Sequence, residues 1–174
     1  MDENIQNSSL ENGKKMKQPK SLLITAILSI LSTGITILAG LQALSGGKPS
    51  EEEIMKSRLQ MAQSLEQIQQ YKMDYLEEVM RKLQIMMDAM YNNFVAYSLV
   101  AAFVASIGLT GVILMLIRKE LGFHLYIVYS FLYVGQSYLF VSPSDVSLFY
   151  VISNFIFSGI FIYFYSRSIS WFRN

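Results

Sequence analysis

The sequence has no cysteine, and only one histidine and three prolines occur among its 174 residues. Without cysteine the chain forms no disulfide, does no thiol chemistry and binds no metal through thiolates. His124 is the only imidazole, and one imidazole without companion ligands does not make a metal site. No histidine and acid accompany the serines in a pattern typical of nucleophilic catalysis, and no glycine-rich phosphate loop occurs. We therefore expect no cofactor, no metal and no enzymatic activity.

Charged residues are missing from four long stretches of the chain. The composition is 52% hydrophobic with a net charge of only +1, which is typical of a small multi-pass membrane protein and points to no nucleic-acid partner. A helix needs about 20 residues to cross a bilayer core of roughly 30 Å. Lipid offers no hydrogen-bond partners to the backbone, so the N–H and C=O groups of each span are expected to pair within a helix. The fold class expected is an all-α integral membrane protein. Its four transmembrane helices are predicted at residues 21–44, 93–117, 121–141 and 146–166.

The first span follows a polar, lysine-containing segment and so has some features of a secretory signal. Its apolar run is longer than the roughly 7 to 15 residues of a signal core, so we expect a retained anchor. Residues 1–20 lack an apolar period and are predicted to be a disordered tail. A second short tail is expected over residues 167–174.

Lys and Arg residues near the span ends predict the orientation. The N-terminal tail has four lysines, the second loop contains Arg118 and Lys119, and the C-terminal end contains Arg167 and Arg173. The loop between the third and fourth spans has no basic residue. Positive charge favours the cytoplasmic side, so both termini are predicted to be cytoplasmic in a cell inner (plasma) membrane. The inverted orientation is the alternative, because long charged loops carry little topological information.

Glycine and proline are absent between residues 50 and 92, which follow the breaker Gly46-Gly47-Lys48-Pro49. Ser50 and Glu53 have the spacing of a helix capping box. Residues 45–92 are therefore predicted to be an extracytoplasmic helical segment. Because no breaker separates this segment from the second span, a continuous helix over 51–117, roughly 100 Å long, is expected.

An apolar stripe follows one face of that helix, interrupted at Arg58 and Lys72. Exposure of the stripe to water would be unfavourable, so we expect it to contact other copies of the chain or a different membrane protein. A bend that lays the segment on the membrane surface is a weaker alternative, because the loop has eight acidic against six basic residues. The interaction residues predicted on the stripe are Leu65, Ile68, Leu76, Val79, Leu83, Met86 and Met90.

Small residues form a second stripe, on the first span. Such stripes allow two helix backbones to approach closely in lipid. The second span has a weaker series, Ala101, Ala105 and Gly108, so antiparallel packing of the two spans within one chain is expected, and a dimer interface is the alternative. The predicted contact residues are Ala26, Ser29, Thr33, Thr36 and Gly40, followed by Ala43.

Gln136 and Asn154 are the only strongly polar side chains at membrane depth. Amides in a bilayer usually hydrogen-bond a neighbouring helix, so a structural Gln136–Asn154 pair is expected. The alternative is a small polar cavity or ligand site shared with Tyr126, Tyr129 and Tyr133. Aromatic residues near span ends are expected at the membrane interfaces; they include Tyr97, Tyr138, Tyr165 and Trp171.

These features favour a non-enzymatic accessory or scaffolding subunit of a membrane protein complex. Its partners would be the lipid bilayer and other membrane-protein chains or copies of itself. The alternative is a small transporter or channel formed by an oligomer. Coupled transport usually leaves an ionisable residue within the bilayer, and none lies near the centre of any predicted span.

Overall fold

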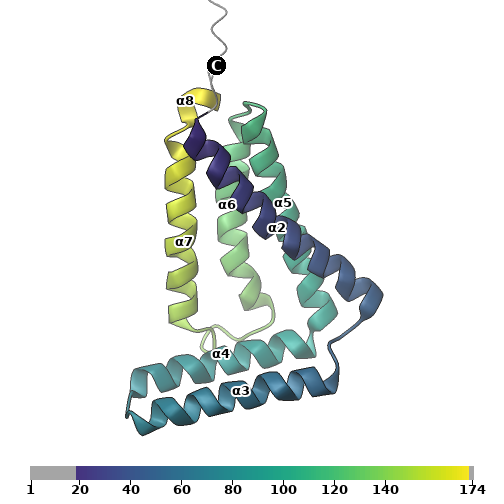
Figure 1. Cartoon of the computed structure of the whole chain (residues 1–174), viewed down its shortest axis with the longest axis vertical. Coiled ribbons are helices and arrows are strands. Elements are labelled where there is room, and N and C mark those ends of the chain that lie inside the picture. Colours follow the sequence, from purple (N-terminus) through teal and green to yellow (C-terminus); the bar gives the residue numbers. More distant parts are fainter. Residues whose placement is uncertain (1–18, 173–174) are drawn as a thin grey trace, which may run out of the picture.

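The computed structural model describes residues 19–172, which form helices and no strand (Figure 1). Most of the predicted tail over residues 1–20 lies outside the described residues, as do the last two residues of the predicted tail over 167–174. The elements in chain order are α2 (Lys20–Gly46), α3 (Glu51–Gln70), α4 (Asp74–Asn92), α5 (Phe94–Leu116), α6 (Leu121–Gly135), the 3₁₀-helix η2 (Gln136–Leu139), α7 (Leu148–Ser166) and α8 (Ile169–Phe172).

Three helices are long and apolar enough to cross a membrane, namely α2, α5 and α7. The prediction of an all-helical protein is therefore confirmed, and the three apolar helices are consistent with a multi-pass membrane protein. The predicted span over residues 121–141 differs from the structure. Its α-helical part, α6, has 15 residues and passes into η2 at Gln136.

Helix α2 crosses α5 at close range (Figure 1). Of the small-residue stripe, Ala26, Ser29, Thr33, Gly40 and Ala43 are buried, while Thr36 is half-buried and donates its hydroxyl to the Ser32 carbonyl. A Cβ atom added at Gly40 would lie 2.5 Å from Ala102 Cβ and 2.9 Å from the Ser98 carbonyl oxygen. Only a residue without a side chain fits there, so the stripe contributes to packing within one chain.

Helices α5 and α6 also approach closely, because a glycine lies on each side of the contact. A Cβ atom at Gly111 would lie 2.9 Å from the Gly122 carbonyl oxygen, and one at Gly122 would meet the Gly111 carbonyl. Beside this contact, Leu22, Val112 and Met115 are fully buried. The Arg118 guanidinium lies 3.9 Å from the ring centroid of Trp171, a cation–π contact that holds α8 against the α5–α6 turn.

The expected continuous helix over 51–117 is wrong, because the chain reverses at Tyr71-Lys72-Met73 and changes direction again at Asn93 (Figure 1). Lys72 adopts a left-handed conformation with φ 52°, which costs a residue with a side chain roughly 1–2 kcal/mol. The Tyr71 and Lys72 amides donate to the carbonyls of Ile68 and Gln69 and close the turn. Across it, the Gln69 side-chain amide donates to Glu77 at 3.0 Å.

Folding back allows α3 and α4 to cover part of each other's apolar stripe. Ile54 of α3 and Val79 of α4 are buried, and burying such side chains stabilises by about 1.5–3 kcal/mol each. This gain outweighs the strain at Lys72. Arg58, which interrupts the predicted stripe, donates to Asp88 of α4 at 2.8 Å. We call α3 and α4 together the hairpin.

The hairpin begins with the predicted capping box, which is confirmed. The Glu53 amide donates to Ser50 Oγ, and the Ser50 amide donates to the Glu53 carboxylate at 2.9 Å. Hydrogen bonds from the Ser50 backbone and side chain lower the pKa of Glu53. Helix α4 lies crosswise beneath the ends of α5, α6 and α7 (Figure 1), so it runs across the bundle rather than extending away from it.

The α2–α5 contact gives a matched pair of glycine substitutions within one helix. We expect Gly40→Ala to lower the free energy of unfolding by about 1–3 kcal/mol, as overpacking does. Gly34→Ala adds the same methyl group where no atom lies within 4 Å, and we expect no loss. Titration with SDS in mixed micelles measures both values. Equal stabilities for the two variants would show that the helices do not approach at Gly40.

Candidate functional site

A hydrogen-bonded triad of Ser29, Tyr126 and Tyr165 joins α2, α6 and α7. The Tyr165 hydroxyl donates to Ser29 Oγ at 2.9 Å, and the hydroxyls of Ser29 and Tyr126 lie 3.3 Å apart. The two tyrosine rings meet edge to face, with centroids 4.8 Å apart. All three side chains are at most 5% exposed. Three helices distant in sequence are therefore fixed by polar contacts that water does not reach.

The sequence predicts Tyr165 in an aromatic belt at a membrane interface, but its side chain packs inside the bundle at the end of α7. Tyr165 is fully buried, because Ser29 offers its hydroxyl a partner 136 positions away. Trp171 is also buried, beneath Arg118. No local sequence pattern predicts the contact between Tyr165 and Ser29, since it depends on how α2 crosses the bundle. The one available signal was Ser29, which the small-residue stripe had identified for a different reason.

A cavity of about 200 Å³ lies beside the triad, between α2, α6 and α7. Asn154 and Ser158 face it from α7, and Tyr129 and Tyr133 from α6. Its remaining lining residues are Ser29, Ser32, Thr33, Tyr126, Phe157 and Phe161. The cavity therefore has hydroxyl and amide groups on several sides, and no Asp, Glu, Lys, Arg or His lines it.

Gln136 and Asn154 do not form the expected hydrogen-bonded pair. The Asn154 side-chain amide donates to the Tyr150 carbonyl of its own helix at 2.8 Å. Gln136 lies in η2, is 5% exposed and has no hydrogen-bond partner for Oε1 within residues 19–172. Ser137 joins η2 to α7 instead, by donating to the Tyr150 hydroxyl at 3.3 Å. Asn154 alone belongs to the polar cavity.

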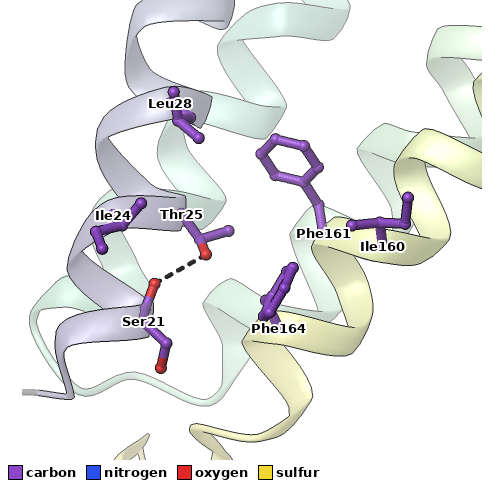
Figure 2. A pocket seen from close by; sticks show the side chains of 7 residues that line it. All are labelled: Ser21, Ile24, Thr25, Leu28, Ile160, Phe161 and Phe164. Carbon is purple, nitrogen blue, oxygen red and sulfur yellow. Dashed lines mark hydrogen bonds between the residues drawn. The ribbon is translucent and has the colours of Figure 1, made fainter.

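A second, apolar groove of about 400 Å³ lies between α2 and α7 (Figure 2). In Figure 2, Thr25 and Leu28 lie on the side of α2 toward Phe161 and Phe164 of α7, and Ile24 and Ile160 complete the lining. The Thr25 hydroxyl does not donate into the groove, because it donates to the Ser21 carbonyl at 2.8 Å. Phe161 lines both this groove and the polar cavity, so the two hollows adjoin.

The predicted interaction stripe of the hairpin is divided between two environments. Val79 is buried, Leu65 and Ile68 are half-buried, and Leu76 is exposed. Leu83, Met86 and Met90 line a cavity of about 190 Å³ together with residues from the bundle, among them Tyr97, Ser137 and Tyr150. The second half of the stripe therefore faces the bundle of its own chain.

Within residues 19–172 there is no cluster of three His, Cys, Asp or Glu residues that could hold a metal ion. His124 is exposed, and its Nδ1 lies 3.2 Å from the Glu120 carbonyl oxygen of its own helix. No protein-family model, curated protein or solved structure matches this chain.

Two tyrosines of α7, Tyr163 and Tyr165, provide a matched test of the triad. We expect Tyr165→Phe to lower the free energy of unfolding by about 1 kcal/mol, because hydrogen bonds between membrane helices contribute amounts of that order. Tyr163→Phe removes the same hydroxyl from an exposed position and should have little effect. SDS titration in mixed micelles again provides the comparison. A loss no larger for Tyr165→Phe than for Tyr163→Phe would contradict the contact.

Proposed function

We propose that the chain is a four-span membrane protein in which α6 and η2 together form the third span, in addition to α2, α5 and α7. The α-helical rise over 15 residues gives about 22 Å, and the 3₁₀ turn adds about 8 Å. The resulting length of roughly 30 Å matches a hydrocarbon core. Helices α5 and α7 run in the same direction, and the chain returns between them through α6 (Figure 1). Two parallel spans joined in this way need a third crossing.

Basic residues support the orientation proposed for these spans. Lys20, Arg118, Lys119 and Arg167 lie at the end of the bundle where α2 begins (Figure 1). At the opposite end, the α6–α7 loop has no Lys or Arg between residues 136 and 147, and Lys48 follows the end of α2. The positive-inside rule therefore favours cytoplasmic termini and an extracytoplasmic hairpin in the cell inner (plasma) membrane.

The lack of native cysteine makes the topology measurable by single-cysteine labelling. A membrane-impermeant maleimide added to intact cells should label Gln63→Cys in α3 and Ser144→Cys before α7. Lys119→Cys, in the α5–α6 turn, should be labelled only after permeabilisation. The reverse pattern would invert the orientation, and labelling of Lys119→Cys and Ser144→Cys from the same side would show that α6 does not cross.

For the biochemical role, we propose a non-enzymatic accessory or scaffolding subunit that binds another membrane-protein chain through the hairpin. The supporting observation is that large apolar side chains remain exposed on the hairpin, outside the three apolar helices. Met55 and Leu59 lie one turn apart on α3 and are 62% and 58% exposed. Tyr71, Met73 and Tyr75 are exposed at its tip. Contact with a partner would remove these side chains from water, and methionine and tyrosine suit such contacts.

The alternative of an oligomeric transporter has less support. The polar cavity between α2, α6 and α7 is lined by hydroxyls, one amide and phenylalanine rings. Ion- or proton-coupled paths usually contain a carboxylate, a lysine, an arginine or a histidine at membrane depth. The accessory role requires no such group.

A charge on the exposed face of α3 tests the accessory role. Leu83 was the obvious position from sequence, but it faces the bundle, so its substitution would disturb folding. We expect Leu59→Glu to remove a co-purifying partner chain from the complex extracted gently from native membranes, because the contact would have to bury a carboxylate. Native mass measurement with identification of every chain gives the result.

The control for that experiment is Gln67→Glu, which adds the same charge at another exposed position of α3. It should leave the complex intact, and both variants should keep the helical content and the detergent-extracted mass of the single chain. Recovery of the same partner with Leu59→Glu would contradict docking through this face. A wild-type preparation that contains copies of this chain alone would contradict an accessory role.

A further inference from the structure

The apolar groove and the polar cavity adjoin between α2 and α7, and we call the two together the cleft. Lining residues from α2 run from Ser21 to Leu28 in the groove and from Ser29 to Thr33 in the cavity. On α7, the lining runs from Phe164 to Ile160 in the groove and continues to Asn154 in the cavity. Phe161 belongs to both hollows. The cleft therefore extends along several helical turns of both helices, and its character changes from apolar to polar.

The apolar end of the cleft is open at its side. Ile24 and Leu28 are 61% and 52% exposed, and Ile160 and Phe164 of α7 are also exposed (Figure 2). In a bilayer these side chains contact hydrocarbon. The cleft is thus accessible from the lipid phase, and its apolar end suits a hydrocarbon chain.

The polar end offers hydrogen-bonding groups that the protein does not use. Among the described residues, side-chain hydrogen bonds engage the hydroxyls of Tyr126 and Tyr165 but not those of Tyr129 or Tyr133. Asn154 uses its amide nitrogen within α7 and has its oxygen free to accept. The three residues line one cavity, so a ligand oxygen or hydroxyl there would meet donors and an acceptor.

The neutral lining of the polar cavity does not suit the charged head of an ordinary phospholipid. No cationic side chain lines the cavity, and a charged head buried there would remain unpaired at a high desolvation cost.

We propose that this cleft binds an uncharged lipid with a small hydroxyl-bearing head, which lies among Tyr129, Tyr133 and Asn154, while its single hydrocarbon chain occupies the groove. A cavity of about 200 Å³ is too small for a whole ligand but fits a small head. The adjoining 400 Å³ lies within the usual range for small-molecule sites. The proposal depends on the membrane bundle and not on partner docking by the hairpin, so either can fail without the other.

Photocrosslinking in nanodiscs tests this site. The full chain is placed in phosphatidylcholine nanodiscs that contain a trace of hexadecanol carrying a diazirine and an alkyne. A parallel sample contains phosphatidylcholine with the same diazirine and alkyne on one acyl chain. We expect several-fold more crosslinking by the alcohol, with adducts on α2 and α7 residues of the cleft. Equal labelling by both probes would overturn the proposal, because any bilayer chain would then fill the groove.

Two pairs of variants locate the labelling. Ser158→Phe fills the polar cavity, and we expect it to abolish the preference for the alcohol, whereas Ser106→Phe adds the same ring on the exposed face of α5 and should not. Tyr133→Phe removes one head-group partner without changing the shape. We expect it to reduce alcohol labelling by about three- to tenfold, the size of one hydrogen bond in a membrane. Tyr163→Phe should leave the labelling unchanged.

Each variant pair has an outcome that overturns the site. Unchanged alcohol labelling in Ser158→Phe would place the ligand elsewhere. If Ser158→Phe does not fold, Tyr133→Phe decides alone, since it removes only a hydroxyl. Equal labelling of Tyr133→Phe and wild type would contradict head-group recognition by α6.

Discussion

The close approach of α2 to α5 is the contact on which the rest of the bundle depends. Lipid gives no hydrophobic drive for two apolar helices to associate, so backbone proximity and dispersion must hold them together. Gly40 provides that proximity, because Ala102 and the Ser98 carbonyl occupy the space of a side chain. With its Gly40 end held on α5, α2 runs obliquely across the bundle and brings Ser29 between α6 and α7 (Figure 1). The tyrosine triad therefore follows from a glycine three turns away.

The same oblique course explains why the bundle is open between α2 and α7. Helix α2 packs extensively on α5 but meets α7 over a shorter stretch around Ser29 and Tyr165. Away from that stretch the two helices leave the apolar groove and the polar cavity. The serines and threonines of α2 mostly satisfy their hydroxyls on their own helix, as Thr25 and Thr33 do. The tyrosines of α6 cannot reach their own backbone, so their hydroxyls depend on other helices or on a ligand.

Much of the fold is predictable from the sequence, because bilayer thickness imposes a length on apolar, uncharged runs. The three apolar helices α2, α5 and α7 lie within a few residues of their predicted spans, and the capping box at Ser50 marks the start of α3.

The reversal at Lys72 was not predictable, since a lysine in a left-handed turn has no local signature. Absence of glycine and proline makes a helix possible but does not make it continuous. Tertiary burial of Ile54 and Val79 decided where the chain turned. The partner of Tyr165 was not predictable for a related reason, because it depends on the crossing of helices far apart in sequence.

The reversal at Lys72 also changes which residues can serve a partner. A straight helix would have presented the whole stripe from Ile54 to Met90 on one exposed face. In the hairpin, Leu83, Met86 and Met90 face the chain's own bundle, and the Arg58–Asp88 ion pair fixes the register of α3 on α4. Because α3 and α4 pack their most apolar faces within the chain, only side chains beside those faces remain available to a partner. Met55 and Leu59 are in this position, about a quarter turn or more from Ile54 on α3, since successive residues are about 100° apart on a helix. A partner that binds there would contact a surface whose position is set by the bundle, so recognition outside the membrane would depend on correct packing within it.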